Sequence, residues 1–148
     1  MKTIFDTATR NGLVSRARQL NDESAAQWGK MNIHQMLQHC TLFDEMVQGK
    51  KQFKRFFLGR LFGKMALKSM IGNENPVKRN LPTLPELVVK ENKGDVETQK
   101  SRWIALIEDY ANYPGAGFVH PFFGKLTHEQ SGYLAYKHID HHLRQFNC

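Results

Sequence analysis

Apolar residues recur every three or four positions in several segments of the chain, a spacing that places them on one face of an α-helix. The clearest series are Ile33, Met36, Leu37, Cys40, Phe43 and Val47; then Trp103, Leu106, Ile107 and Tyr110; and finally Ala135, Ile139, Leu143 and Phe146. Residues 6–20 contain few strand formers and no proline, and suit a further helix. The pattern therefore predicts an all-α fold.

Capping residues and prolines indicate where these helices begin and end. Asn32 suits the N-terminus of a second helix that ends near Gln48, before Gly49. Thr127 and Gln130 have capping-box spacing and should start the last helix, and residues 95–112 form the helix before it. Residues 72–94 contain three prolines and predict a loop. The result is a four-helix bundle with a long crossover between the second and third core helices.

The segment 50–71 combines basic and apolar residues, and two glycines weaken its helical pattern. We expect a solvated helix face whose phenylalanines complete the core. The alternative is that its positive charge helps to hold an acidic thiol cofactor or an acidic substrate.

Composition adds broad limits. The chain has 148 residues, which suits one domain over residues 1–148, with no apolar run of membrane-spanning length. The N-terminus has an early acid and no apolar stretch, so no secretory signal is expected, and two cysteines favour reduced thiols in a bacterial-type cytoplasm. The net charge of +7 does not choose among nucleic acid, acidic membranes and small anions. Nucleic acid is an unlikely partner, because no recognised motif accompanies the charge.

Histidines carry the clearest candidate chemistry. His138 and His142 are four residues apart, so they share one side of the last helix, roughly 95° and 55° from the middle of its apolar stripe, whereas His141 lies roughly 155° away. His39 lies at the edge of the second helix's apolar stripe. Two or three imidazoles so placed can bind one transition metal. The alternative is a set of surface or hydrogen-bonded core histidines.

Four blocks of sequence resemble an uncharacterised family of the DinB-like superfamily. They are Trp28 to Asn32, Gln35 to Cys40, His120 to Thr127 and Tyr136 to Phe146. The resemblance implies a four-helix bundle with a metal-binding histidine triad at one end. The triad falls on His39, His138 and His142, with Gln145 at the position of a glutamine that often follows the last ligand. Leu143-Arg144-Gln145 departs from the common Arg-Gly-Gln ending, which leaves the role of Arg144 open.

Three neutral histidines leave the ion's charge uncompensated, so the site favours an anionic partner such as hydroxide or a thiolate. This chemistry predicts a metal-dependent enzyme that activates a thiol or water against a small electrophilic substrate. The resemblance implies a thiol transferase or hydrolase type, with a low-molecular-weight thiol as a second cofactor. Zinc, nickel, iron or manganese would serve as the metal. The alternative is a noncatalytic bundle with a structural metal or none, acting as a binding or dimerisation module; a homodimer stays open.

Other residues receive plainer interpretations. A pocket should open at the ion, walled by the second and last helices and residues 117–123. His34 and His141 are expected at the surface, and Cys40 in the core. His120 is expected to fix its loop through a hydrogen bond. Asp140 should point away from the histidines on its own helix.

Overall fold

The computed structural model describes residues 1–114 and 118–148, and this part of the chain is mostly helical. Its five α-helices, two 3-10 turns and two strands are α1 (Thr7–Ala17), α2 (Ile33–Val47), α3 (Phe57–Ile71), η1 (Pro85–Leu87), α4 (Val96–Asp109), η2 (Tyr110–Asn112), β1 (Val119–His120), β2 (Gly124–Lys125) and α5 (His128–Gln145). The strands pair antiparallel, with Val119 opposite Lys125. No described helix has both the length and the apolar character required to cross a membrane.

Side-chain caps determine where most of the helices begin. The Asn32 side chain accepts a hydrogen bond from the Gln35 N–H, and the Gln35 side chain accepts one from the Asn32 N–H, which completes a capping box. Thr127 and Gln130 form the same box at α5, and Asp95 caps α4 through the Thr98 N–H. The predicted starts of these three helices are confirmed.

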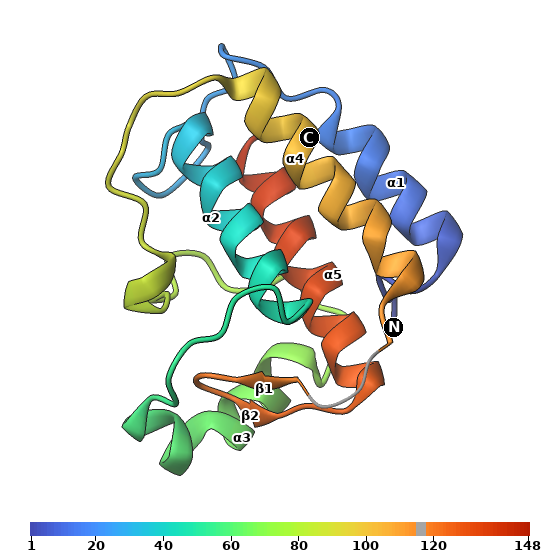
Figure 1. The fold of residues 1–148 in the computed structure, drawn as a ribbon, viewed down its shortest axis with the longest axis vertical. Helices are drawn as coiled ribbons and strands as arrows, with labels where there is room; N and C mark the ends of the chain where they lie inside the picture. Colours follow the sequence, from blue (N-terminus) through green and yellow to red (C-terminus); the bar gives the residue numbers. More distant parts are fainter. Residues whose placement is uncertain (115–117) are drawn as a thin grey trace.

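Four of the helices pack around the core, as Figure 1 shows. Helix α4 lies against α2 and α1, and α5 lies against the same two helices from the other side. Trp103 is fully buried among them, and its indole N–H donates to the Asp44 carboxylate at 2.8 Å. The predicted contact between the second and last helices is confirmed, and it brings the histidine-bearing segments together.

Helix α3 lies at one end of the molecule, where it contacts the β1–β2 hairpin and α5 (Figure 1). Gly59 and Gly63 face the hairpin so closely that a β-carbon at either position would overlap the Phe122 carbonyl oxygen. The two glycines that weaken the helix therefore allow backbone-to-backbone contact. The helix begins at Phe57, so the expectation of a helical segment from residue 50 is wrong for residues 50–56.

The long connection from α2 to α4 holds α3 and then residues 72–94, where η1 is the only regular element. Its prolines explain this irregularity, because they lack the backbone donor that a helix needs. Leu84 and Leu87 belong to this segment and are buried in the core, so residues 72–94 pack against the helices. The helix expected over residues 95–112 is α4, which ends at Asp109 and is followed by η2 to Asn112.

Candidate metal centre

Three histidines from α2 and α5 converge at the contact between these helices. His39, His138 and His142 each offer one ring nitrogen, and these nitrogens lie within 4.8 Å of one another. The Nε2 atoms of His39 and His138 are 3.1 Å apart. Two lone pairs cannot face each other at this distance, so a proton or a cation has to lie between them. The structure thus brings together the three residues that the sequence predicted.

Oxygen acceptors orient two of the rings. The Nδ1–H of His39 donates to the Leu87 carbonyl at 2.9 Å, and the Nδ1–H of His142 donates to Gln145 Oε1 at 2.8 Å. The orientation of the Gln145 amide is fixed in turn, because its Nε2 donates to the Trp28 carbonyl at 2.8 Å. A proton on Nδ1 leaves Nε2 with its lone pair, which is the arrangement of histidine ligands in metal sites.

The third ring is held by stacking. The His138 ring lies on Phe43, with centroids 3.7 Å apart and an angle of 12° between the planes. Its Nδ1 is buried without a hydrogen-bond partner among the described residues. His138 therefore differs from the other two histidines, because packing rather than an acceptor sets its orientation.

Burial keeps the three imidazoles neutral. It lowers the pKa of His39, and it lowers the pKa values of His138 and His142 well below the usual histidine range. The positive charge that a neighbouring histidine would carry lowers the values of His138 and His142 further. Neutral imidazoles are the form that binds a transition metal, so the donor set fits a divalent transition metal.

His120, in the β1–β2 hairpin, has a structural role. The Nδ1 of His120 accepts hydrogen bonds from the backbone N–H groups of Phe122 and Phe123, both at 3.1 Å. Burial, followed by the charge of Arg55, lowers the pKa of His120 to about 3. The expected loop-fixing role is confirmed.

Two other histidines differ from expectation. His34 is buried, because the backbone at Gly94 packs so closely on its ring that a side chain there would overlap it. His141 is only partly exposed, with its ring 5.6 Å from that of Trp28. The prediction of surface positions is wrong for both, since helix angles take no account of the loops that cover a helix.

Cys40 and Asp140 are close to the three histidines in the sequence, but each has a structural role of its own. Cys40 is fully buried, as expected, and burial raises the pKa of its thiol. Asp140 forms ion pairs with Arg16 and Arg144, each at 2.7 Å. This gives Arg144 a structural partner and keeps Asp140 away from the histidines.

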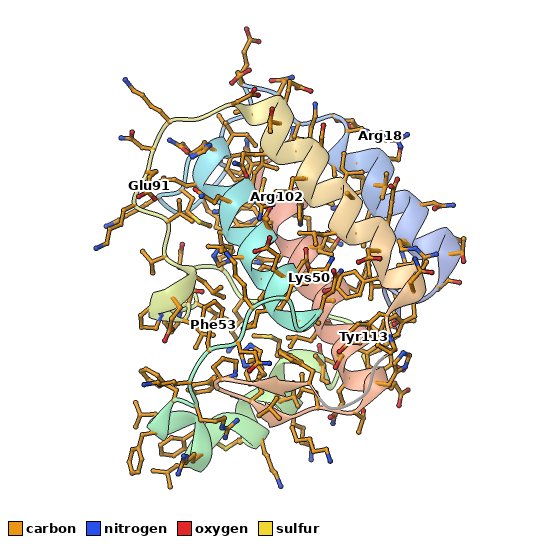
Figure 2. The ribbon with its side chains drawn as sticks, viewed as in Figure 1. Arg18, Lys50, Phe53, Glu91, Arg102 and Tyr113 are labelled. Carbon is orange, nitrogen blue, oxygen red and sulfur yellow. The ribbon has the colours of Figure 1, made fainter. Side chains whose placement is uncertain are left out.

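A cavity of about 410 Å³ lies beside the end of α2, with the hairpin on its other side. Phe53 and Tyr113, both labelled in Figure 2, belong to its lining. Its lining also includes Met46, Val47, Gln48, Gly49, Lys51, Gln52, Arg55, Pro114, Phe118 and Val119. None of the three histidines lines this cavity, so it is not the pocket expected at the ion. Gly117, part of that expected wall, lies outside the described residues.

The sequence analysis missed the Leu87 carbonyl as the partner of His39. A backbone carbonyl in an irregular loop carries no signal of its own in a sequence. The partnership of Gln145 with His142 had a local signal, because residues three apart on a helix are neighbours.

Together these features define a mostly helical protein with a cluster of three histidines, two of them buried and His138 partly exposed. The profile of the DUF1569 family, described as "Protein of unknown function", matches residues 5–148. The chain therefore belongs to this family. No curated protein and no solved structure matches the chain.

Proposed function

We propose that His39, His138 and His142 bind one divalent transition metal and that the protein is a metal-dependent enzyme acting on a small electrophilic substrate. The observation that carries the proposal is the convergence of three neutral imidazoles, two of them oriented through Nδ1 by oxygen acceptors. The cyclic packing of α1, α4, α2 and α5 supports a four-helix bundle of DinB-like type. In this proposal residues 1–148 form one such domain, and it acts in the cytoplasm.

Each residue has a defined task in this proposal. His39 and His142 present Nε2, because Leu87 and Gln145 hold the proton on the other nitrogen of each ring. His138 completes the set from one turn before His142, with Phe43 fixing its ring plane. A divalent cation held by neutral ligands supplies a Lewis acid that makes water or a thiol nucleophilic near pH 7. The net ligand charge of zero is what favours an anionic nucleophile over a neutral one.

One observation favours the second candidate, a noncatalytic helical domain whose metal is structural. His39 and His142 are both buried, and the described cavity of about 410 Å³ is lined by neither. A closed site of this kind would stabilise the contact between α2 and α5 without admitting a substrate. The two candidates agree on the ligands and differ in whether a substrate reaches the ion.

Metal-loaded protein assayed with thiols and electrophiles, and separately with esters and amides, tests the catalytic proposal. His142→Ala removes a proposed ligand, and His128→Ala is the control, since His128 lies on the same helix but is exposed and stacks on Phe5. We expect turnover by the wild type and by His128→Ala and its loss in His142→Ala. Equal rates for all three proteins across the panel would refute catalysis at this site. Tight metal binding with no turnover on any compound would favour the structural candidate.

A further inference from the structure

Helix α3 exposes an apolar face that no other described part of the chain covers. Phe57 is 72% exposed, Leu61 65% and Met65 68%, and Leu58 and Phe62 are each 50% exposed. Single apolar residues are normal on a protein surface, whereas a contiguous group of large ones indicates an interaction site. The expectation that the phenylalanines of residues 50–71 complete the core is wrong for Phe56, Phe57 and Phe62.

The periodicity of the helix separates this face from the buried one. At about 100° per residue the five exposed apolar residues fall within a sector of roughly 140°. Gly59, Gly63 and Leu67 lie on the opposite side, buried against the rest of the chain. Arg60, Lys64 and Lys68 follow one another at intervals of four along one border of the apolar sector. The helix thus presents an apolar stripe with a basic row beside it.

The charge of the whole chain is concentrated in this region. Seven of the 21 Lys and Arg residues lie between positions 46 and 73, and no Asp or Glu does. The other 14 basic residues are balanced by the 14 acidic ones. The net charge of +7 therefore belongs to α3 and the segment before it.

Three of these seven basic side chains interact with other described residues, and four do not. Lys50 pairs with Asp109 and Lys51 with Glu45, while Arg55 donates to the His120 carbonyl. The remaining four are exposed and form no ion pair or side-chain hydrogen bond with any described residue: Lys54, Arg60, Lys64 and Lys68. Figure 2 shows the side chains of α3 extending outward at the end of the molecule.

We infer that α3 and residues 50–56 form a binding site for an anionic lipid surface. The apolar stripe enters the boundary between head groups and acyl chains, and the basic row contacts the lipid phosphates. Fifteen helical residues extend about 22 Å, enough to lie in the plane of the interface but too few to cross a bilayer. The protein is then a peripheral membrane protein, a property separate from the proposed metal chemistry.

The charge and the apolar stripe of α3 favour an anionic lipid surface over two other partners, a second copy of the chain and nucleic acid. A second copy of the chain placed face to face would bring two such groups of four basic side chains together, and like charges at close range repel. Nucleic acid would satisfy the basic row through its phosphates but would leave the apolar stripe in water. An anionic lipid surface satisfies both parts of the face at once.

Vesicle flotation of the full-length chain tests the inference. Vesicles of phosphatidylcholine alone are compared with vesicles of phosphatidylcholine and phosphatidylglycerol in equal amounts, at low and high salt. We expect binding to the mixed vesicles, weak binding to phosphatidylcholine, and a decrease of binding with salt. Each basic residue near an anionic surface contributes enough that losing two should weaken binding about thirtyfold.

Two pairs of matched variants separate the parts of the face. Phe57→Ser with Leu61→Ser is compared with Leu81→Ser and Val88→Ser, which change exposed apolar residues elsewhere. Arg60→Gln with Lys64→Gln is compared with Lys90→Gln and Lys93→Gln, which lower the net charge equally. We expect both α3 variants to lose about tenfold or more in vesicle affinity and both controls to bind as the wild type does. All of these positions are exposed, so circular dichroism should show the same fold throughout.

Three results would overturn the inference. The first is failure of the wild type to float with the mixed vesicles. The second is flotation that the α3 variants reduce no more than their controls. The third is a dimer in sedimentation velocity that Phe57→Ser with Leu61→Ser dissociates, in a protein that does not bind vesicles. None of these measurements depends on a bound metal, so the proposed function and this inference fail independently.

Discussion

Replacing Gln145 by Met tests how the ligand His142 is held. The side chains have similar volume, but Met removes the acceptor 2.8 Å from His142 Nδ1 and the donor 2.8 Å from the Trp28 carbonyl. Loss of an acceptor bound to a metal-ligating histidine typically lowers metal affinity by about 10–100-fold. The buried N–H of His142 left without a partner should also reduce the free energy of unfolding by about 1–3 kcal/mol.

The assay is a zinc titration against a chromophoric chelator, combined with urea unfolding of the metal-free protein. Gln48→Met is the control, because Gln48 also donates to a main-chain carbonyl, that of Leu106 at 2.7 Å, but forms no hydrogen bond with a histidine among the described residues. We expect Gln48→Met to lose stability and keep zinc affinity, and Gln145→Met to lose both. Equal zinc affinity for Gln145→Met and the wild type would refute the reasoning that Gln145 orients a ligand.

Two further predictions concern stability. Burial raises the pKa of Asp44 to about 7, so near pH 5 the folded state holds a proton that the unfolded state has released. The free energy of unfolding should therefore fall by roughly 3 kcal/mol between pH 5 and 8. Urea titrations of Asp44→Asn should show a flatter dependence of this free energy on pH. Gly63→Ala should destabilise the protein, because its β-carbon would overlap the Phe122 carbonyl, whereas Gly12→Ala in α1 meets no atom within 4 Å and should stabilise by about 0.5–1 kcal/mol through helix propensity. Thermal unfolding checks both glycine variants; a gain in stability for Gly63→Ala, or a steeper pH dependence for Asp44→Asn, would contradict the respective argument.

Local signals in the sequence predicted most of the helical structure. A capping box needs only two residues three positions apart, so the starts at Asn32 and Thr127 could be located without any tertiary information. Helix angles likewise indicated that His138 and His142 flank the core. The position of His39 beside them followed from its own apolar stripe and from the family resemblance.

What the sequence could not predict depends on contacts made by irregular backbone. The cover over His34 comes from Gly94, sixty positions away, and the acceptor for His39 is the carbonyl of Leu87. The first contact requires only that residue 94 has no side chain, and the second is made by backbone, so neither identifies its partner in the sequence. The exposure of the α3 face was not predicted either, because an apolar stripe alone does not indicate whether another part of the chain covers it.

The most direct test of the metal centre is metal content per chain for protein purified without a histidine tag and loaded with zinc. The wild type should bind one ion. Single changes of His39, His138 or His142 to Ala should each remove most of the affinity, while His141→Ala should retain it, since the His141 side chain is not among the three that converge. Stoichiometric binding that survives loss of His138 but not of His141 would contradict the assignment of the site.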